Sequence, residues 1–324
     1  MTTSWCTASE RTWRRRRGWT ERRDEIIIYG AIEAGGTRWV CATVDEDGKV
    51  MARRVLPTTT PSRTLAEAIG FFREWGPVSA VGVGAFGPLD LRPGSATFGF
   101  ITTTPKAGWA HTDLLTPLRD ALAVPVALDT DVNSAAIGER RWGSAVGLRD
   151  FIYLTVGTGI GGGVFVNDEL VRGTQHPEVG HMRIPHDLSV DPFPGSCPYH
   201  GDCLEGLASG VAMRERWRRS AEDLNDAAPW ELEANYLALG LVNLTLALVP
   251  ERIIVGGGVA RHAGLLALTR RKLIELLAGY LDHPGLSDGF EEYVIPPGLG
   301  DLSGVLGASE LARGATAGER ITGG

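Results

Sequence analysis

One short stretch of the sequence gathers residue types that bind a metal ion through nitrogen and sulfur. Its two imidazoles and two thiols are His181, Cys197, His200 and Cys203. This is the number and kind of ligand that a closed tetrahedral zinc site uses. The last three ligands stand three positions apart, so a tight turn can bring them onto one ion, and His181 joins them after a loop of fifteen residues. The stretch therefore predicts a structural zinc site.

Two other interpretations account for the same residues. In the first, the stretch is a polar loop in which two cysteines are simply buried, without a metal. In the second, the zinc is catalytic, which requires an open coordination position and usually fewer sulfur ligands. A compact set of four ligands at this spacing favours the structural metal over both.

Three glycine-rich turns each follow an apolar strand. They are Gly35-Gly36-Thr37, Gly157-Thr158-Gly159 and Gly256-Gly257-Gly258. Because glycine has no side chain, the backbone amides of such turns can approach and bind a phosphate, and the hydroxyls of Thr37 and Thr158 can add donors. Together the three turns indicate a nucleotide bound across a cleft, although any single one also suits a hairpin. None matches a P-loop, and none is a GxGxxG that opens a helix.

A single acid stands where a buried strand meets a helix. Asp131 follows the apolar strand 124–128, and a helix is expected from about Val132. The positive end of that helix favours the ionised carboxylate, which can accept a proton from a hydroxyl group during phosphoryl transfer. The alternative is that Asp131 is only the N-cap of the helix. Asn133, two residues further on, adds a polar group to the same site.

Two more acids flank the metal ligands. Glu178 precedes His181 by three positions, and Glu205 follows Cys203 by two. A metal that fixed the loop would also fix these two hydroxyl acceptors, and His181 would keep its second ring nitrogen free. The arrangement favours a sugar-like ligand. A glycoside hydrolase with paired carboxylates ranks lower, because it has no use for three phosphate-binding turns.

Length and composition limit the class of protein. A chain of 324 residues with 43% hydrophobic residues exceeds what one core usually serves, so we expect two domains. The net charge of −7 argues against a nucleic-acid partner. No apolar segment approaches the ~20 residues that span a membrane. The four cysteines, two of them in the metal cluster, fit a reduced, cytoplasmic location.

The first 25 residues differ from the rest, because they hold seven arginines against four acids. Their order of charged and apolar residues does not match a signal peptide. We expect a disordered leader in residues 1–25 rather than an arm for an anionic partner. The segment is also too short for a helix-turn-helix domain that would bind DNA.

Apolar runs and turns predict an α/β protein with a repeated plan. Strands are expected at 26–33, 38–44, 50–56, 78–86, 124–128, 151–156, 164–166, 169–171, 251–255 and 293–295. Helices are expected at 60–75, 113–123, 132–142, 265–281 and 304–312, with 210–249 mostly helical. Strand, glycine turn and strand occur at 26–44 and again at 151–166, which indicates a duplicated domain around a cleft.

With these residues in view, the sequence resembles the ROK family (repressor, open reading frame, kinase) of sugar kinases, and within it the bacterial fructokinase branch. The resemblance covers essentially residues 28–312. Its motifs are EAGGT at Glu33, FGPLD at Phe86, TPKAGW at Thr104, TDVNSAAIGE at Thr130, TVGTGIGGG at Thr155, HPEVGH at His176, CPYHGDCLEGLASG at Cys197 and IIVGGGV at Ile253. They are numerous and occur in order along the chain.

The resemblance implies an actin-like, ribonuclease-H-like fold of two α/β domains that close on ATP and a sugar. On this basis residues 26–126 form the N-terminal domain and 127–311 the C-terminal domain, with an inserted zinc-binding loop at 176–205. A last helix at about 312–324 is expected to pack back on the first domain. Homodimers are usual among the proteins that this sequence resembles, so a homodimer is expected.

The resemblance also implies roles for the site residues. Asp131 corresponds to the base, and the zinc ligands correspond to His181, Cys197, His200 and Cys203. Sugar contacts are expected from Thr130, Asn133, Glu178, His181, Glu205 and Trp109. Nucleotide contacts are expected from Gly35, Gly36, Thr37, Arg38, Gly157, Thr158, Gly159, Gly256, Gly257 and Gly258.

Departures from the family pattern refine this assignment. Glu33 and Arg38 stand where many members carry Asp and Lys, so we expect Glu33 to organise Mg²⁺ through water rather than by direct ligation. Thr130 and His200 replace the Asn and the third Cys of the family's glucokinases, and this favours fructose. The predicted function is an ATP-dependent fructokinase that acts on the 6-hydroxyl. The alternatives are a kinase for glucose, mannose or N-acetylmannosamine, or a sugar sensor without catalysis, and no membrane partner is expected.

Overall fold

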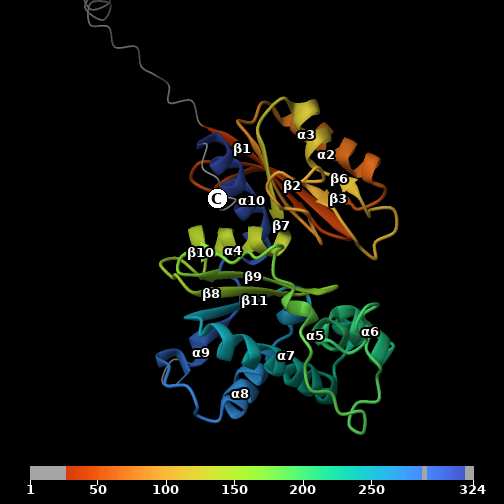
Figure 1. The fold of residues 1–324 in the computed structure, drawn as a ribbon, viewed down its shortest axis with the longest axis vertical. Coiled ribbons are helices and arrows are strands. Elements are labelled where there is room, and N and C mark those ends of the chain that lie inside the picture. Colours follow the sequence, from red (N-terminus) through yellow and green to blue (C-terminus); the bar gives the residue numbers. More distant parts are fainter. Residues whose placement is uncertain (1–26, 287–289, 318–324) are drawn as a thin grey trace, which may run out of the picture.

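Two five-stranded sheets form the framework of the protein (Figure 1). The computed structural model describes residues 27–286 and 290–317. The predicted leader at 1–25 lies outside the described residues, as do the last seven positions of the helix expected at about 312–324. The strands of the first sheet are β1 (Ile28–Ala34), β2 (Arg38–Asp45), β3 (Val50–Pro57), β4 (Val81–Ala85) and β7 (Val126–Thr130). Those of the second are β8 (Phe151–Val156), β9 (Ile160–Val166), β10 (Glu169–Leu170), β11 (Arg252–Gly256) and β12 (Val294–Ile295).

The two sheets repeat one topology. Their orders are β3-β2-β1-β4-β7 and β10-β9-β8-β11-β12. In each, the first strand pairs antiparallel with the second and parallel with the fourth, and the fifth is parallel to the fourth. The second strand of each sheet also pairs antiparallel with the third. The repeated strand-turn-strand pattern of the sequence is the local part of this repeated topology.

Helices cover both faces of each sheet. The longer ones are α2 (Pro61–Trp75), α3 (Leu115–Leu122), α4 (Asp131–Trp142), α7 (Ala227–Leu248), α8 (Leu265–Leu277) and α10 (Ser303–Ala317). The shorter elements are β5 (Phe100–Ile101), β6 (Thr112–Asp113), α5 (Leu204–Ala208), α6 (Gly210–Trp217), α9 (Phe290–Tyr293) and the 3₁₀ turns η1 (Val179–His181), η2 (Ala221–Asp223), η3 (Val259–Arg261), η4 (Pro284–Leu286) and η5 (Gly300–Leu302). Within the described ranges, no helix has the length and apolar character that crossing a bilayer requires.

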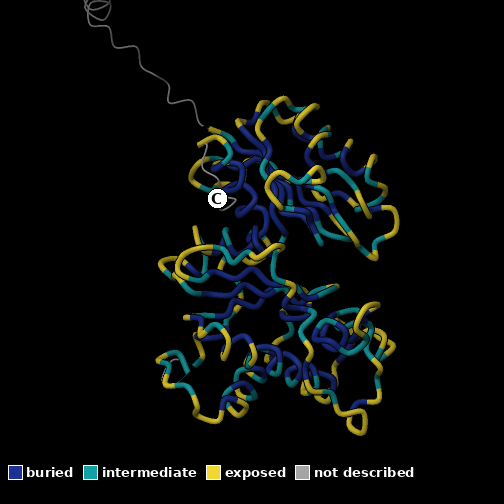
Figure 2. The backbone as a smooth tube through the Cα atoms, viewed as in Figure 1, coloured by how far each residue is buried: buried dark blue, intermediate teal, exposed yellow. Residues whose placement is uncertain are grey.

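The alternation of side chains along the strands explains the layers. In β8, Ile152 and Leu154 belong to a core shared with α7 and α8, while Tyr153 points to the opposite face, toward α4. The first sheet has the same arrangement, because its two faces contribute to separate cores, one containing residues of α2 and α3 and the other residues of α10. Figure 2 shows the buried strands at the centre of each half. Helices α4 and α10 therefore lie between the two sheets.

Close approach of backbones joins these two inner helices. A Cβ atom at Gly307 of α10 would overlap the carbonyl oxygen of Ser134 in α4, and one at Gly138 would collide with the carbonyl of Ser303. Only glycine allows two helices to approach so closely at these points. The contact holds the N-terminal end of α4 and the segment that leads into α10 in one fixed relation.

Three expectations about the chain need revision. The predicted boundary at 126/127 falls at the start of β7, which pairs with β4 and so belongs to the first sheet. The helices expected at 304–312 and at about 312–324 are, over the described residues, one helix, α10, which begins at Ser303 and packs on β1, β4 and β7. The glycines at 161–163 lie in β9 rather than in a turn, because α4 packs directly over them and a Cβ at Gly163 would collide with the Val132 carbonyl.

The α4–α10 contact generates a stability prediction. Gly307→Ala should lower the free energy of unfolding by about 1–3 kcal/mol or more, because the new methyl group has only backbone to displace. Gly70→Ala is the matched control in α2, where an added Cβ has no neighbour within 4 Å. Since alanine favours a helix interior over glycine, the control should be neutral or stabilising by ~0.5–1 kcal/mol. Chemical denaturation of both variants measures the difference, and equal stabilities would contradict the tight contact.

Candidate functional site

The carboxyl ends of the parallel strands meet at one place between the sheets. Strands β1, β4 and β7 of the first sheet, and β8 and β11 of the second, all end there. In α/β sheets ligands bind outside the carboxyl ends of strands, where backbone groups and loop residues are free to contact them. A cavity of about 180 Å³ lies at this position. It is bordered by residues from β1, β2, β8, the start of α4, the turn after β11 and the segment before α10.

Asp131 lies in the wall of this cavity at the first position of α4. The helix is capped by its neighbour Thr130, whose side-chain oxygen accepts a hydrogen bond from the Asn133 amide (3.1 Å). The sequence left open whether Asp131 is only the N-cap of this helix. In the structure Thr130 is the N-cap, so Asp131 is not needed for that role. Asp131 Oδ1 accepts a hydrogen bond from the Val132 amide (2.9 Å). Burial raises the pKa of Asp131 from 3.8 to about 6.

A second acid and two arginines share the same cavity. Glu33, at the end of β1, has its pKa raised from 4.5 to about 7, first by burial and then by repulsion from Asp131. Arg38 lowers that pKa in part, and it borders the cavity together with Arg261 of η3. Arg261 forms an ion pair with Asp301, which lies in the segment before α10. The cavity therefore combines two acids whose pKa values are raised, Glu33 and Asp131, with cationic groups at its edge.

The structure places the predicted glycine turns around this region, with unequal roles. Gly257 and Gly258 border the cavity, and Gly257 has a φ of 97° that favours glycine. The turn that contains Gly35, Gly36 and Thr37 joins β1 to β2 and is closed by a hydrogen bond from the Gly35 amide to the Arg38 carbonyl (2.9 Å). Gly157, Thr158 and Gly159 join β8 to β9, and Gly256 is the last residue of β11. The turns at 35–37 and 157–159 do not border the cavity, although Arg38, directly after the first of them, does.

Polar groups beyond Asp131 form a second, connected network. Asn133 is buried and donates from Nδ2 to Asp129 Oδ1 (2.7 Å), while its own Oδ1 has no hydrogen-bond partner among the described residues. Asp129 is fully buried at the end of β7, and its other oxygen accepts from Arg172. The Nε of Arg172 is likewise buried without a partner in the described part of the chain. An unsatisfied acceptor and an unsatisfied donor thus belong to the two residues that contact the Asp129 carboxylate, and hydroxyl groups of a ligand can supply partners of both kinds.

The two predicted sugar acids lie near one another and near Asp131. Burial, followed by repulsion from Glu205 and from Asp131, raises the pKa of Glu178 from 4.5 to about 7. Glu205 Oε2 accepts the amide hydrogen of Ile160 at the start of β9 (2.9 Å). A Cβ at Gly159 would collide with that oxygen. The turn after β8 therefore acts, at least in part, as a support for Glu205.

The four predicted metal ligands converge. Their ligand atoms all lie within 4.8 Å of one another, and they are His181, Cys197, His200 and Cys203. The Nδ1 of His181 lies 3.7 Å from Cys197 Sγ and 3.6 Å from Cys203 Sγ. With Zn–S near 2.3 Å and Zn–N near 2.0 Å, the edge of a tetrahedral zinc site is about 3.6 Å. The donor set and spacing fit zinc, and with Nδ1 near both sulfur atoms, the Nε2 of His181 is not needed as a zinc ligand.

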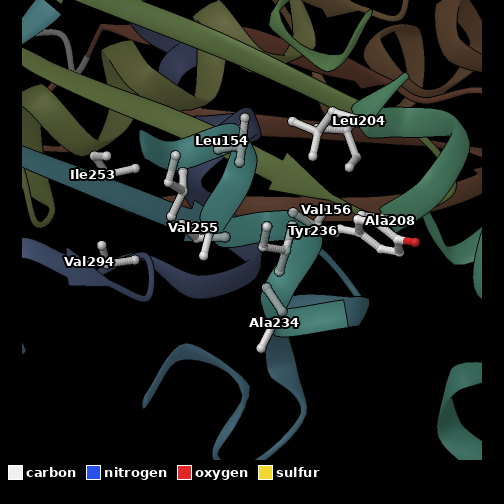
Figure 3. Close-up of a cluster of buried hydrophobic side chains, with 14 of the residues drawn as sticks. Leu154, Val156, Leu204, Ala208, Ala234, Tyr236, Ile253, Val255 and Val294 are labelled. Carbon is white, nitrogen blue, oxygen red and sulfur yellow. The ribbon is translucent and has the colours of Figure 1, made fainter. Parts of the chain in front are cut away.

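A hydrophobic anchor connects this cluster to the second sheet. Cys203 directly precedes α5, and Figure 3 shows Leu204 and Ala208 of α5 beside Leu154, Val156 and Val255 of β8 and β11. These side chains belong to one buried core. Glu205 follows Leu204, so the packing of α5 and the metal cluster together determine where that acid lies.

Trp109 has a different place from the predicted one. Its side chain is fully buried in the first domain's core, with ring centres 5.7 Å from Trp39 and 5.5 Å from Phe86. Its indole nitrogen donates to the Thr59 carbonyl (2.8 Å). With its polar atom satisfied and its ring enclosed, Trp109 supports the packing of the loop rather than contacting a ligand.

Comparison with known proteins identifies the family. The model of the ROK family matches residues 29–315. The chain belongs to the ROK family. A protein of Bacillus subtilis (strain 168) named putative fructokinase is 43% identical over 297 residues, which cover 91% of this chain and 99% of that protein. The fructokinase of Zymomonas mobilis is 44% identical over 299 residues, covering 88% of this chain and 96% of that protein.

A solved ROK structure agrees in fold. The ROK family glucokinase from Streptomyces griseus, in complex with glucose and AMPPNP, superposes with a TM-score of 0.71 at 26% identity. The match covers 89% of this chain and 99% of the glucokinase. The predicted actin-like α/β fold with two domains around a cleft is therefore confirmed for this ROK chain.

One positioning residue of the ROK site was missed by sequence reasoning. Glu139 of α4 is fully buried, and its carboxylate accepts hydrogen bonds from Ser144 N (2.7 Å), Gly298 N (3.0 Å), Leu299 N (3.0 Å) and Ser303 Oγ (2.7 Å). These donors hold the segment that contributes Gly300 and Asp301 to the cavity. The only sequence signal was an acid in an otherwise apolar helix face, which does not reveal partners about 160 positions away.

The metal cluster of this ROK protein can be tested by metal content. Cys203→Ala should lower bound zinc from about one per chain to well below that value, because three remaining ligands hold zinc much more weakly. Thermal stability and sugar-dependent activity should fall with it, since Glu205 loses its anchor. Elemental analysis of the purified variant measures the zinc.

Cys41→Ala is the matched control for that change. Cys41 is a buried thiol in β2 outside the cluster, so its loss should reduce stability slightly but leave the zinc content unchanged. Full zinc content in Cys203→Ala, or equal loss in both variants, would contradict the assignment of the ligands.

Proposed function

We propose that this ROK protein is an ATP-dependent hexose kinase that transfers the γ-phosphoryl group to the 6-hydroxyl of D-fructose. The observation that carries the proposal is Asp131, a carboxylate fixed at the start of α4 in a cavity shared with Gly257 and Gly258 and with two arginines. A pKa of about 6 leaves Asp131 ionised at neutral pH yet basic enough to accept a hydroxyl proton.

The residues that border one end of the cavity suit a nucleotide. Gly257 and Gly258 present backbone without side chains, and Arg38 and Arg261 supply positive charge for phosphate oxygens. The AMPPNP in the S. griseus glucokinase complex supports ATP as the nucleotide. The turns at 35–37 and 157–159 complete this end of the cleft once the two domains approach each other around the ligands.

Mg²⁺ is the metal that the reaction requires, and the donor set fits it. Glu33 and Asp131 are hard oxygen donors. Burial, followed by repulsion from Asp131, raises the pKa of Glu33 to about 7, and a divalent cation would relieve that repulsion. Bound there with the nucleotide, Mg²⁺ would neutralise charge on the transferred phosphoryl group. We propose zinc at the His/Cys cluster as a structural ion, held by His181, Cys197, His200 and Cys203.

The sugar end lies on the other side of Asp131. Glu178, Glu205 and the free Nε2 of His181 provide acceptors or donors for sugar hydroxyls, and Asn133 presents an unsatisfied Oδ1. Fructose is favoured over glucose because the relatives named fructokinase are 43–44% identical, against 26% for the S. griseus glucokinase. Thr130 is buried and caps α4, so we propose that it contributes to the sugar site by holding Asn133 rather than by contacting the sugar.

The chemical step uses the groups in this order. The 6-hydroxyl of the sugar donates its proton to Asp131 as the hydroxyl oxygen forms a bond to the γ-phosphorus of ATP. The bond from that phosphorus to the β,γ-bridging oxygen breaks, and ADP leaves with the bonding electron pair. Closure of the domains excludes water, which would otherwise accept the phosphoryl group. The products are sugar 6-phosphate and ADP, while assembly as a homodimer in the cytoplasm stays a prediction.

The substrate can be tested by measuring ADP release. With magnesium-ATP, the purified protein should turn over D-fructose with a kcat/KM at least ~10-fold above that for glucose, mannose or N-acetylmannosamine, because one pocket contact is worth about 1–3 kcal/mol. Zinc content is determined on the same sample. Preference for another sugar would keep the kinase and reject fructose. Sugar binding without any turnover would favour a sugar sensor instead.

The base can be tested with Asp131→Asn. The variant should lose about 10²–10⁴-fold in kcat while still binding sugar, because the amide cannot accept the proton. In the unchanged protein, kcat/KM should rise with pH through about 6 as Asp131 ionises. Parental turnover in the variant would reject Asp131 as the base.

The same variant has a stability signature. Because the folded state raises the pKa of Asp131 from 3.8 to about 6, the folded protein binds this proton more tightly than the unfolded chain. The ionised group is therefore destabilising above pH 6, and this penalty disappears as the pH falls toward 3.8. Asp131→Asn should thus be more stable than the parent at pH 7–8, and the gain should shrink at acidic pH.

A further inference from the structure

His176 connects the two halves of the molecule beside the sugar end of the cavity. It lies in the loop between β10 and η1, and its side chain is only 7% exposed. Its Nε2 lies 3.2 Å from the backbone nitrogen of Leu89, which follows β4 in the first domain. Its Nδ1 lies 3.4 Å from Glu178 Oε1. One imidazole thus touches a backbone amide of the first domain and a sugar-site acid of the second.

The Leu89 amide determines which nitrogen of His176 carries the hydrogen. Because the Leu89 amide can only donate, Nε2 must be the unprotonated ring nitrogen, and Nδ1 carries the hydrogen, with the Pro177 backbone and Glu178 Oε1 (3.4 Å) as its neighbours. Burial lowers the pKa of His176, which favours this neutral form. Asp129 is the nearby charge that opposes this effect. The ring is therefore oriented with an acceptor toward one domain and a donor toward the other.

The first-domain side of this contact is firmly held. The Phe86 amide donates to the Ala34 carbonyl (2.8 Å), and Asp90 accepts from Arg92, Ser95 and Thr97. A Cβ at Gly87 would lie 3.5 Å from both Cε1 and Nε2 of His176, so the ring packs against the backbone of this segment. The amide that His176 contacts is thus part of a rigid segment.

The other side of the contact lacks such support. Glu178 has 42% of its side chain exposed, and the imidazole of His176, whose Nδ1 lies 3.4 Å from Glu178 Oε1, is its neighbouring donor. Repulsion from Glu205 and from Asp131 acts on Glu178 from the cavity side. An acid in this setting adopts a defined position only if a donor holds it.

We propose that His176 is the positioning residue of the sugar site: it holds Glu178 toward the sugar by bracing it against the Leu89 amide of the opposite domain. The inference rests on the proposed function, because it assigns Glu178 to a sugar hydroxyl. His176 itself need not touch the sugar. It makes the orientation of Glu178 depend on how the two domains are placed, because the amide that braces His176 and the acid that His176 contacts belong to opposite domains.

Three substitutions separate the two contacts. In His176→Gln the amide oxygen can reach the position of Nε2 and keep the acceptor for Leu89, whereas in His176→Asn the shorter amide keeps a donor near Nδ1. His176→Ala removes both groups. We expect the alanine variant to weaken D-fructose binding about 10-fold, and each amide variant to restore part of that loss. The KM for ATP should change less than about twofold, since the nucleotide end does not contact His176.

A double substitution tests whether His176 acts through Glu178. If it does, Glu178→Gln and His176→Ala should each weaken sugar binding, and the pair together should be little worse than Glu178→Gln alone. His283→Ala, far along the sequence near η4, serves as a control that should leave sugar binding unchanged. Zinc content and thermal stability of every variant confirm that the fold and the metal cluster persist.

Equilibrium titration with D-fructose, followed by intrinsic fluorescence, is the measurement, and steady-state kinetics run beside it. Additive effects of the two substitutions, or equal changes for sugar and ATP, would overturn the positioning role. If the unchanged protein binds fructose without phosphorylating it, the kinase proposal fails while the titrations still test His176. If it binds fructose in neither assay, both proposals fail together.

Discussion

The architecture depends on the contact between α4 and α10, where backbone meets backbone at Gly307 and Gly138. Helix α10 packs on the first sheet, and α4 packs on the second and also contacts β4 of the first, so their mutual contact sets the relation between the two halves. Asp131 opens α4 three residues before Ser134, and the segment containing Asp301 leads directly into α10. The proposed base and part of the nucleotide wall are therefore attached to the same rigid joint. Small residues are needed there because no side chain can be repacked to relieve a clash with main-chain atoms.

Buried acids in this protein fall into two groups that differ in their donors. Glu139, Asp129 and Asp90 each accept three or more hydrogen bonds, from backbone amides, hydroxyls, a side-chain amide or an arginine. Such carboxylates maintain geometry, because their charge is fully compensated. Glu33, Asp131 and Glu178 instead have pKa values raised first by burial, and repulsion from Asp131 adds to the shift at Glu33 and Glu178. Holding such incompletely compensated acids together is unfavourable for folding, so their arrangement is best explained by cations and hydroxyl groups that bind there.

The sequence predicts a feature well when the residues that determine it are close together in the chain, and poorly when they are far apart. The metal ligands, Asp131 and the repeated strand-turn-strand units are local patterns, and the structure brings the ligands together and places Asp131 in the cavity. Glu139 and His176 act through partners 159 and 87 positions away, which no local pattern reveals. The place of β7 in the first sheet is likewise a matter of pairing with β4. Trp109 stands in a recognisable motif, but its burial is decided by Trp39 and Phe86, which come from other segments.

The two sheets are alike in order, yet the connections after their third strands differ, and this difference gives the proposed zinc ion a structural role. In the first half, α2 returns the chain directly to β4, whereas in the second a long segment runs from β10 to β11. Its part from 171 to 203 contains only η1 and isolated bridges, such as the one between Arg183 and Cys203. Irregular loops of this length are rare in compact domains unless they have a function and an internal support. A metal joined to four side chains would supply that support, and it would hold the sugar acids independently of the helix joint that holds Asp131. The site then has two separately anchored halves, and the hydrogen bond between His176 and Leu89 is one of the places where they meet.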